Sequence, residues 1–200
     1  MRLFLPRWIA VISVLGLIST AVAQKTDSSQ SAEMLPSAPI FTAADLAAKV
    51  PPPKPDDVKS LDSILRAAYD VISGPAGDRD WSRFRSLFLP QARFTQVGKT
   101  PEGAVIVLSW GVDEFIRDAT AVFAKEPFYE HGVVNLPESY GNMTQVLSSY
   151  ESRHSPSEKP FTRGVNSFQV LNDGKRWWIV SIFWDSERPD NPLPEKLQKH

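Results

Sequence analysis

The stretch Asp173-Gly-Lys-Arg-Trp-Trp-Ile-Val-Ser-Ile-Phe-Trp-Asp185 holds three of the six tryptophans in this chain of 200 residues. It follows on from Asn172, and the Asn-Asp-Gly sequence is typical of a tight hairpin turn because Asn and Asp before Gly favour left-handed backbone conformations. We therefore expect the final strand of a sheet at 177–184. Alternation predicts one face with Trp177, Ile179, Ser181 and Phe183, and an opposite face with Trp178, Val180, Ile182 and Trp184.

Five more extended segments precede this strand. Runs of β-branched and aromatic residues between turn residues place them at 92–97, 103–109, 128–136, 143–153 and 161–171. The proline-rich stretch 188–194, which follows the last strand, is unsuited to a sheet interior. We expect it to follow the edge of the sheet as an irregular segment.

Three helices are predicted in the N-terminal half of the core. The first has apolar residues at spacings of three and four along one face, namely Val58, Leu61, Leu65, Ala68 and Ile72. A second, short helix is expected over 80–88, before Pro90, and a third over 112–124. This order predicts an α+β fold in which three helices pack on a strongly curved, mixed or antiparallel sheet of about six strands.

Three stretches of the core match a known pattern. They are Asp80-Trp81 followed by Leu87-Phe-Leu-Pro-Gln-Ala-Arg-Phe94, the strand Gly141-Asn-Met-Thr-Gln-Val-Leu-Ser-Ser-Tyr-Glu-Ser-Arg153, and the segment from Arg163-Gly-Val-Asn-Ser-Phe-Gln169 through Asp173-Gly174 to Ser181. Over about residues 57–186 the sequence thereby resembles the NTF2-like (SnoaL-like) domain superfamily.

The resemblance implies a cone-shaped sheet whose open end, partly closed by helices, forms a pocket. Members of the superfamily include isomerases, dehydratases, cyclases, dioxygenase subunits, transport adaptors and domains with no known activity. The matching residues belong to strands and turns rather than to a catalytic fingerprint. The resemblance therefore predicts where a pocket lies and leaves its chemistry open.

The first 56 residues precede this core. Arg2 and Arg7, the uncharged apolar run 8–20 and the cleavage pattern Ala21-Val-Ala23 predict a signal peptide over 1–23. The alternative is an uncleaved membrane anchor, for which this run is short against a span of about 20 residues. Residues 24–56, rich in Ser, Pro and Ala, are expected to form a mostly disordered linker in which Thr42 could cap a short helix. The domain is then placed at 57–195, with a tail at 196–200.

Composition narrows the location and the partners. The chain has no cysteine, which excludes disulfides and thiolate chemistry, and an exported protein without disulfides fits a bacterial periplasm or exterior. A net charge of −1 without any basic run argues against nucleic acid and against anionic lipid. We expect no membrane contact after signal cleavage. We expect neither cofactor nor metal, because Glu130 and His131 are adjacent in a strand and point to opposite faces.

Candidate pocket residues come from the strand and helix faces expected to line the cone. They are Tyr69, Trp110, Phe115, Tyr129, His131, Tyr150, Asn166 and Trp177. No Asp or Glu falls on the inward faces assigned to the last three strands, which is the main argument against proton-transfer catalysis. His131 is the best candidate for an acid–base group, although a structural strand histidine is the simpler interpretation.

Three functions remain open. The leading hypothesis is an exported domain that binds a small apolar or aromatic molecule, or a partner, in its cone without established catalysis. An alternative is an isomerase, dehydratase or cyclase that uses His131 as general base, with Tyr150 or Asn166 polarising an oxygen. A third is a dimeric interaction module, because an outer face bearing Trp178 and Trp184 is unusually apolar for a solvated surface and would suit a homodimer.

Overall fold

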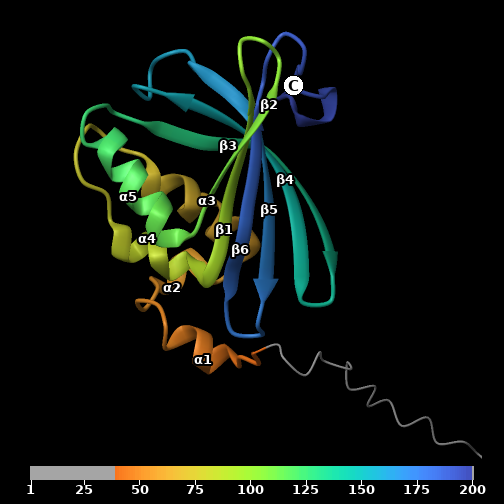
Figure 1. Cartoon of the computed structure of the whole chain (residues 1–200). Coiled ribbons are helices and arrows are strands. Elements are labelled where there is room, and N and C mark those ends of the chain that lie inside the picture. The colour runs from red at the N-terminus through yellow and green to blue at the C-terminus, as the bar shows by residue number, and fades with distance from the viewer. Residues whose placement is uncertain (1–38, 200) are drawn as a thin grey trace, which may run out of the picture. The chain divides into compact units, whose positions relative to one another are not determined.

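The computed structural model describes residues 39–199, so the predicted signal peptide and part of the predicted linker lie outside the described residues. Figure 1 shows the longer helices gathered on one side of a single sheet. The helices are α1 (Ala43–Ala47), α2 (Pro55–Val58), α3 (Leu61–Ile72), α4 (Trp81–Leu87), α5 (Val112–Phe123) and the short 3₁₀ helix η1 (Glu195–Leu197). The strands are β1 (Phe88–Lys99), β2 (Val105–Trp110), β3 (Tyr129–Tyr140), β4 (Met143–Arg153), β5 (Thr162–Asn172) and β6 (Trp177–Ser186).

The α+β prediction is confirmed, and the last strand takes a central place. The six strands form one mixed sheet in the order β2-β1-β6-β5-β4-β3. Every neighbouring pair is antiparallel except β1 and β6, which run parallel. β1 starts at Phe88 rather than at the predicted residue 92, and its register against β6 shifts between Phe88 and Arg93. This irregularity accommodates Pro90, which cannot donate a ladder hydrogen bond.

The first predicted helix is divided into α2 and α3. Ser60 starts α3, because its Oγ accepts a hydrogen bond of 3.1 Å from the backbone N–H of Ser63. Arg83 of α4 holds the two parts together. Its Nε and Nη2 donate to the carboxylate of Asp57 on α2 at 2.7 and 2.9 Å, and its Nη1 donates to Asp70 on α3. Asp57 is buried, so this bidentate pair supplies the contacts that its charge requires.

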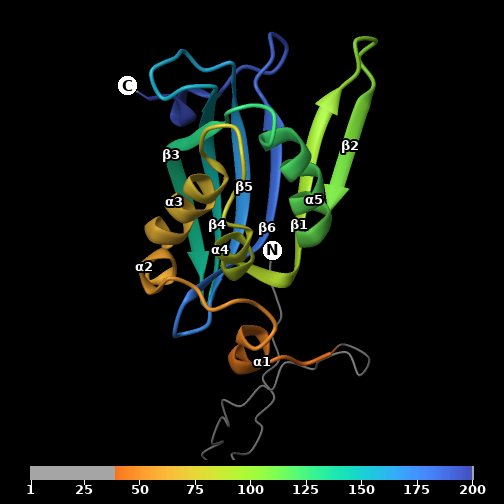
Figure 2. The same cartoon turned by 90° about the vertical axis from the view of Figure 1, so that its left-hand side faces the viewer.

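The main core lies between helices α3 to α5 and the concave face of the sheet (Figure 2). Phe84 of α4 is its centre, with a ring stacked on Phe115 of α5 at a centroid distance of 5.4 Å and on Phe94 of β1 at 5.6 Å. Stacked aromatic rings of this kind add to the free energy gained from burying their area.

A bulge in β6 reverses the predicted faces of its second half. The pairing with β5 passes from Ile179 to Ser181, so Val180 has no partner on β5. Ile179 is fully buried in the core, and beyond the bulge Ile182 and Trp184 also face the core side. The prediction that Ile182 and Trp184 lie on the outer face is therefore wrong, because alternation holds only along an unbroken ladder.

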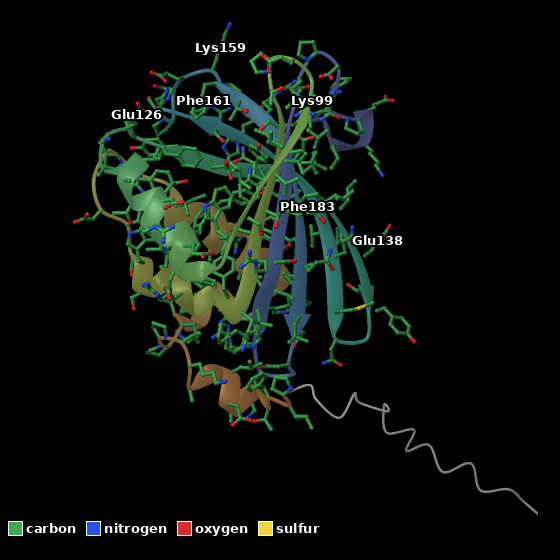
Figure 3. All side chains as sticks on the ribbon, viewed as in Figure 1. Lys99, Glu126, Glu138, Lys159, Phe161 and Phe183 are labelled. Atoms are coloured by element: carbon green, nitrogen blue, oxygen red, sulfur yellow. The ribbon has the colours of Figure 1, made fainter. Side chains whose placement is uncertain are left out.

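The outer face of β6 carries Trp178 and Phe183. Trp178 is fully buried: the guanidinium carbon of Arg176 lies 3.6 Å from its ring centroid, and its Nε1 donates to the carboxylate of Asp173 at 2.8 Å. Phe183 is exposed and lies on the side of the sheet away from the helices (Figure 3). Two of the four apolar residues predicted for the outer face, Ile182 and Trp184, therefore do not lie on it. A dimer through this face stays a prediction.

The two ends of the described chain pack locally. Thr42 caps α1 as expected, since its Oγ1 accepts from the N–H of Asp45 at 3.2 Å. At the other end Leu193 and Leu197 are buried, and η1 contacts β3. Within residues 39–199, no helix is long and apolar enough to cross a membrane.

Candidate functional site

A cavity of about 300 Å³ lies between the helices and the concave face of the sheet. Its wall is mainly aromatic: the rings come from α4, β1, α5 and β5 and from the loop before β3, and they are Phe84, Phe88, Phe94, Phe115, Phe123, Phe128 and Phe168. A mainly apolar wall with few polar groups is typical of a site for a small molecule. The polar groups therefore decide which chemistry the cavity could support.

Tyr69 and Asn166, which line the cavity, form a hydrogen-bonded group with Ser148. Tyr69 comes from α3, and its hydroxyl shares a hydrogen bond of 2.6 Å with Ser148 of β4. The amide Nδ2 of Asn166, on β5, donates to the same hydroxyl at 3.1 Å. All three residues are buried, so each bond replaces a contact with water that folding removed.

Glu130 of β3 lies beside this group and also lines the cavity. Ser152 donates its hydroxyl hydrogen to Oε2 of Glu130 at 2.6 Å. Desolvation of the carboxyl group raises the pKa of Glu130 to about 7, although hydrogen bonds from Ser152 and Asn166 partly oppose the shift. Near neutral pH this group is therefore present in both its protonated and its ionised form.

Two phenols face the same cavity as this carboxyl group. Desolvation raises the pKa of Tyr150 to about 12, and the neighbouring charge of Glu130 contributes to the rise. The pKa of Tyr69 is raised for the same two reasons. Both phenols therefore keep their protons at neutral pH, and the hydroxyl of Tyr150 is bonded to that of Ser186 at 3.1 Å.

Two glycines make room for these phenols. A Cβ atom on Gly164 would come within 2.6 Å of the Tyr150 hydroxyl oxygen, and one on Gly132 within 2.9 Å of the Tyr69 ring. Gly132 and Gly164 flank Tyr150 on the neighbouring strands, in one row across β3, β4 and β5. The missing side chains at these two positions leave space for the ring of Tyr69, which comes from α3, and for the hydroxyl group of Tyr150 on β4.

Trp110 and Trp184 form another part of the cavity wall. Their rings are stacked at 6.0 Å between centroids, and the Nε1 of Trp110 donates to the carboxylate of Asp118 on α5 at 3.0 Å. The hydrogen bond fixes the Trp110 ring against α5. The cavity thus has a flat aromatic wall in addition to its carboxyl and phenol groups.

A polar cleft of about 770 Å³ lies next to the cavity, and Tyr69 and Glu130 line both. His131 lies on the cleft side and is exposed. Arg153 contacts its Nδ1 at 3.0 Å, and Glu151 lies 3.7 Å from its Nε2. Desolvation and the charge of Arg153 lower the pKa of His131, while Glu151 opposes them. His131 is therefore a neutral group outside the cavity.

The structure separates the eight predicted pocket residues into three groups. Five of them line the cavity: Tyr69, Trp110, Phe115, Tyr150 and Asn166. Tyr129 and His131 line the polar cleft instead. Trp177 lines neither and packs against the main core.

Sequence reasoning missed Glu130. The expectation that no carboxyl group faces the cone is wrong, because it was based on the last three strands alone, and Glu130 lies on the strand before them. The signal was present: Glu130 and His131 are adjacent, so a histidine on the outside places the glutamate inside. Residues 39–199 hold no group of three or more His, Asp or Glu side chains arranged to bind a metal ion.

The fold is NTF2-like, as the sequence resemblance implied, with the cavity between the helices and the concave sheet. Similar solved structures include a protein with a cystatin-like fold from Nostoc punctiforme, with a TM-score of 0.48 and 10% identity over 68% of this chain and 98% of that one. A protein from Caulobacter vibrioides, also with a cystatin-like fold, gives a TM-score of 0.49 and 11% identity over 66% of this chain and 90% of that one.

A third similar structure is an NTF2-like protein of unknown function from Silicibacter pomeroyi. It gives a TM-score of 0.44 and 15% identity, over 64% of this chain and 94% of that one. No protein-family model matches the sequence, and no curated protein matches it. Such likenesses concern the fold alone, so the function has to be argued from the cavity.

Proposed function

We propose that the cavity binds a small, mainly apolar ring compound that carries one oxygen, and that Glu130 transfers a proton to or from it. The observation that carries this proposal is a carboxyl group with a pKa of about 7 in an aromatic cavity. A general base is most effective when its pKa lies near the working pH. The proposal replaces His131 with Glu130 as the acid–base group of an isomerase or dehydratase.

The cavity also supplies groups that could hold the oxygen of such a compound. The phenol of Tyr150 keeps its proton and faces the cavity, so it could donate to a carbonyl oxygen. The stacked Trp110 and Trp184 offer a flat apolar surface for a ring. Glu130 could then remove a proton from the carbon next to the carbonyl group.

A bicyclic ketone tests this proposal. The compound 2-tetralone has acidic hydrogens next to its carbonyl group, and their exchange for deuterium in D₂O can be followed by NMR. We expect exchange faster than in buffer alone, loss of the acceleration in Glu130→Gln, and retention of it in His131→Gln. Acceleration that survives in Glu130→Gln would rule out Glu130 as the base.

A second candidate function is binding without reaction. It is favoured by one observation: the hydroxyl of Tyr69 is already bonded to both Ser148 and Asn166, and that of Tyr150 to Ser186. Binding of 2-tetralone, seen as quenching of tryptophan fluorescence, without accelerated exchange would support this candidate over catalysis.

We further propose that the protein acts outside the cytoplasm of a bacterium. The predicted signal peptide over 1–23 and the absence of cysteine support this location. Expression of the full chain in a bacterial host, followed by mass spectrometry of the periplasmic fraction, tests it. We expect a mature N-terminus at Gln24, and an uncleaved chain in the cytoplasmic fraction would contradict the proposal.

A further inference from the structure

Strand β2 is an edge strand with an exposed apolar surface. It pairs with β1 on one side, and Figure 2 shows no other element along its free side. Four consecutive residues in it are exposed, namely Val105 (64%), Ile106 (44%), Val107 (61%) and Leu108 (47%). Because successive side chains point to opposite faces, both faces of this strand are apolar and exposed to solvent.

The other edge of the sheet is protected, which makes β2 exceptional within the described residues. Strand β3 contains Pro137 and a register shift between Gly132 and Val134, and helix η1 contacts it. Prolines, bulges and covering segments are the usual means by which an edge strand avoids pairing with another chain. Strand β2 has no proline, no charged residue and no bulge.

We propose that β2 pairs antiparallel with β2 of a second copy of this chain, about a two-fold axis near Val107. The two sheets would then form one continuous sheet across the dimer, and the unpaired N–H and C=O groups of both edges would bond to each other. In such a pairing Val107 lies opposite Val107 of the other copy, Ile106 lies opposite Leu108, and Val105 lies opposite Ser109. No charged side chain from 104–110 would be buried, because that segment contains none.

Charges at the two ends of the strand favour a second copy as the occupant. Glu102 precedes β2, is exposed, and has no ion-pair partner within residues 39–199. Arg93 on β1 lies beside the opposite end of β2, where it donates to the hydroxyl of Ser109 at 2.9 Å. Its distance to the carboxylate of Glu114 is 4.0 Å. An antiparallel pairing brings Glu102 of each copy towards Arg93 of the other.

Light scattering coupled to size-exclusion chromatography, over a series of protein concentrations, tests the dimer. We expect a mass twice that of one chain at the upper concentrations, and dimerisation weakened roughly tenfold or more in Val107→Lys, because lysine on an edge opposes pairing. Phe183→Lys is the matched control, since Phe183 is similarly exposed but lies on the outer face of β6. We expect this control to dimerise like the unaltered protein.

Two results would overturn the proposal. One is a monomer at every concentration. The other is a dimer that persists in Val107→Lys and is lost in Phe183→Lys, which would place the contact on the outer face. Two variants test the charge pair. Glu102→Arg should weaken the dimer, and the double variant Glu102→Arg/Arg93→Glu should restore it. If the double variant does not restore the dimer, the antiparallel register is excluded. Val107 does not line the cavity, so we expect Val107→Lys to exchange the hydrogens of 2-tetralone like the unaltered protein. Failure of the dimer can therefore be distinguished from failure of the proposed function.

Discussion

Gly132 of β3 lies directly against the ring of Tyr69 from α3. A Cβ atom on Gly132 would come within 2.9 Å of Cε2 of Tyr69 and within 3.2 Å of the hydroxyl oxygen of Ser148. The missing side chain thus allows the phenol to reach Ser148 and Asn166 across the layer between helix and sheet. Helix α3 is thereby held against the sheet at the polar part of the cavity.

Replacement of Gly132 by alanine should therefore destabilise the protein and alter the cavity. We expect a loss of about 1–3 kcal/mol in the free energy of unfolding, because Tyr69 is held by two hydrogen bonds and cannot move freely. Urea unfolding followed by tryptophan fluorescence measures it. Gly98→Ala is the control, since a Cβ there would lie 3.4 Å from the flexible side chain of Ile106. Equal stability of both variants would contradict the close contact.

Tyr69→Phe should cost the protein the hydrogen bonds of the phenol while keeping its ring. Ser148 and Asn166 would each lose a partner in a buried site, which typically costs about 1–3 kcal/mol. The stability is measured by urea unfolding. Ser148→Ala leaves the bond between Asn166 and Tyr69 in place, so we expect it to cost less than Tyr69→Phe. A larger cost for Ser148→Ala would show that the Tyr69 hydroxyl is not the centre of this group.

The elements of the fold were largely predictable, because periodicity and turn residues act locally. The six strands and the three core helices occur in the predicted order, and the turn before Trp177 joins β5 to β6 as expected. What sequence did not reveal was the division between α2 and α3. Ser60 starts α3 at that point, and α2 is held against α3 by Arg83, whose contacts with Asp57 and Asp70 join residues far apart in the chain.

The cavity was predictable only in part. Five of the predicted pocket residues line the cavity, and they were chosen because aromatic and amide residues on inward faces are visible as a pattern. The face of the sheet on which Ile182 and Trp184 lie could not be predicted, because the bulge at Val180 depends on pairing between strands rather than on the sequence of one strand. The raised pKa of Glu130 could not be predicted either, since it arises from desolvation by residues distant in sequence.

The bulge in β6 predicts opposite responses at neighbouring positions. Trp184 packs against the core and stacks on Trp110, whereas Phe183 is exposed on the outer face. We expect Trp184→Ala to lower the free energy of unfolding by about 2–4 kcal/mol, and Phe183→Ala to change it by less than about 0.5 kcal/mol. Thermal or urea unfolding compares the two. Unbroken alternation from Trp177 would give the reverse order.

The raised pKa of Glu130 predicts how stability depends on pH. The unfolded chain titrates this carboxyl near its usual value of 4.5, and the folded protein near 7, so between these values the folded state binds the proton more tightly. The free energy of unfolding should therefore fall as pH rises from about 4.5 to about 7, by at most about 3 kcal/mol from this group, and level off above. Urea unfolding at several pH values measures the slope.

Glu130→Gln should remove this slope and stabilise the protein most above pH 7, where the unaltered chain carries a desolvated carboxylate. His131 contributes with the opposite sign, because its lowered pKa makes the unfolded state bind the proton more tightly. His131→Gln therefore serves as the control: the overall fall in stability with rising pH should become steeper in it, because the opposing contribution of His131 is removed. If Glu130→Gln leaves the pH dependence unchanged, the carboxyl is not desolvated in the folded protein, and proton transfer by Glu130 loses its physical basis.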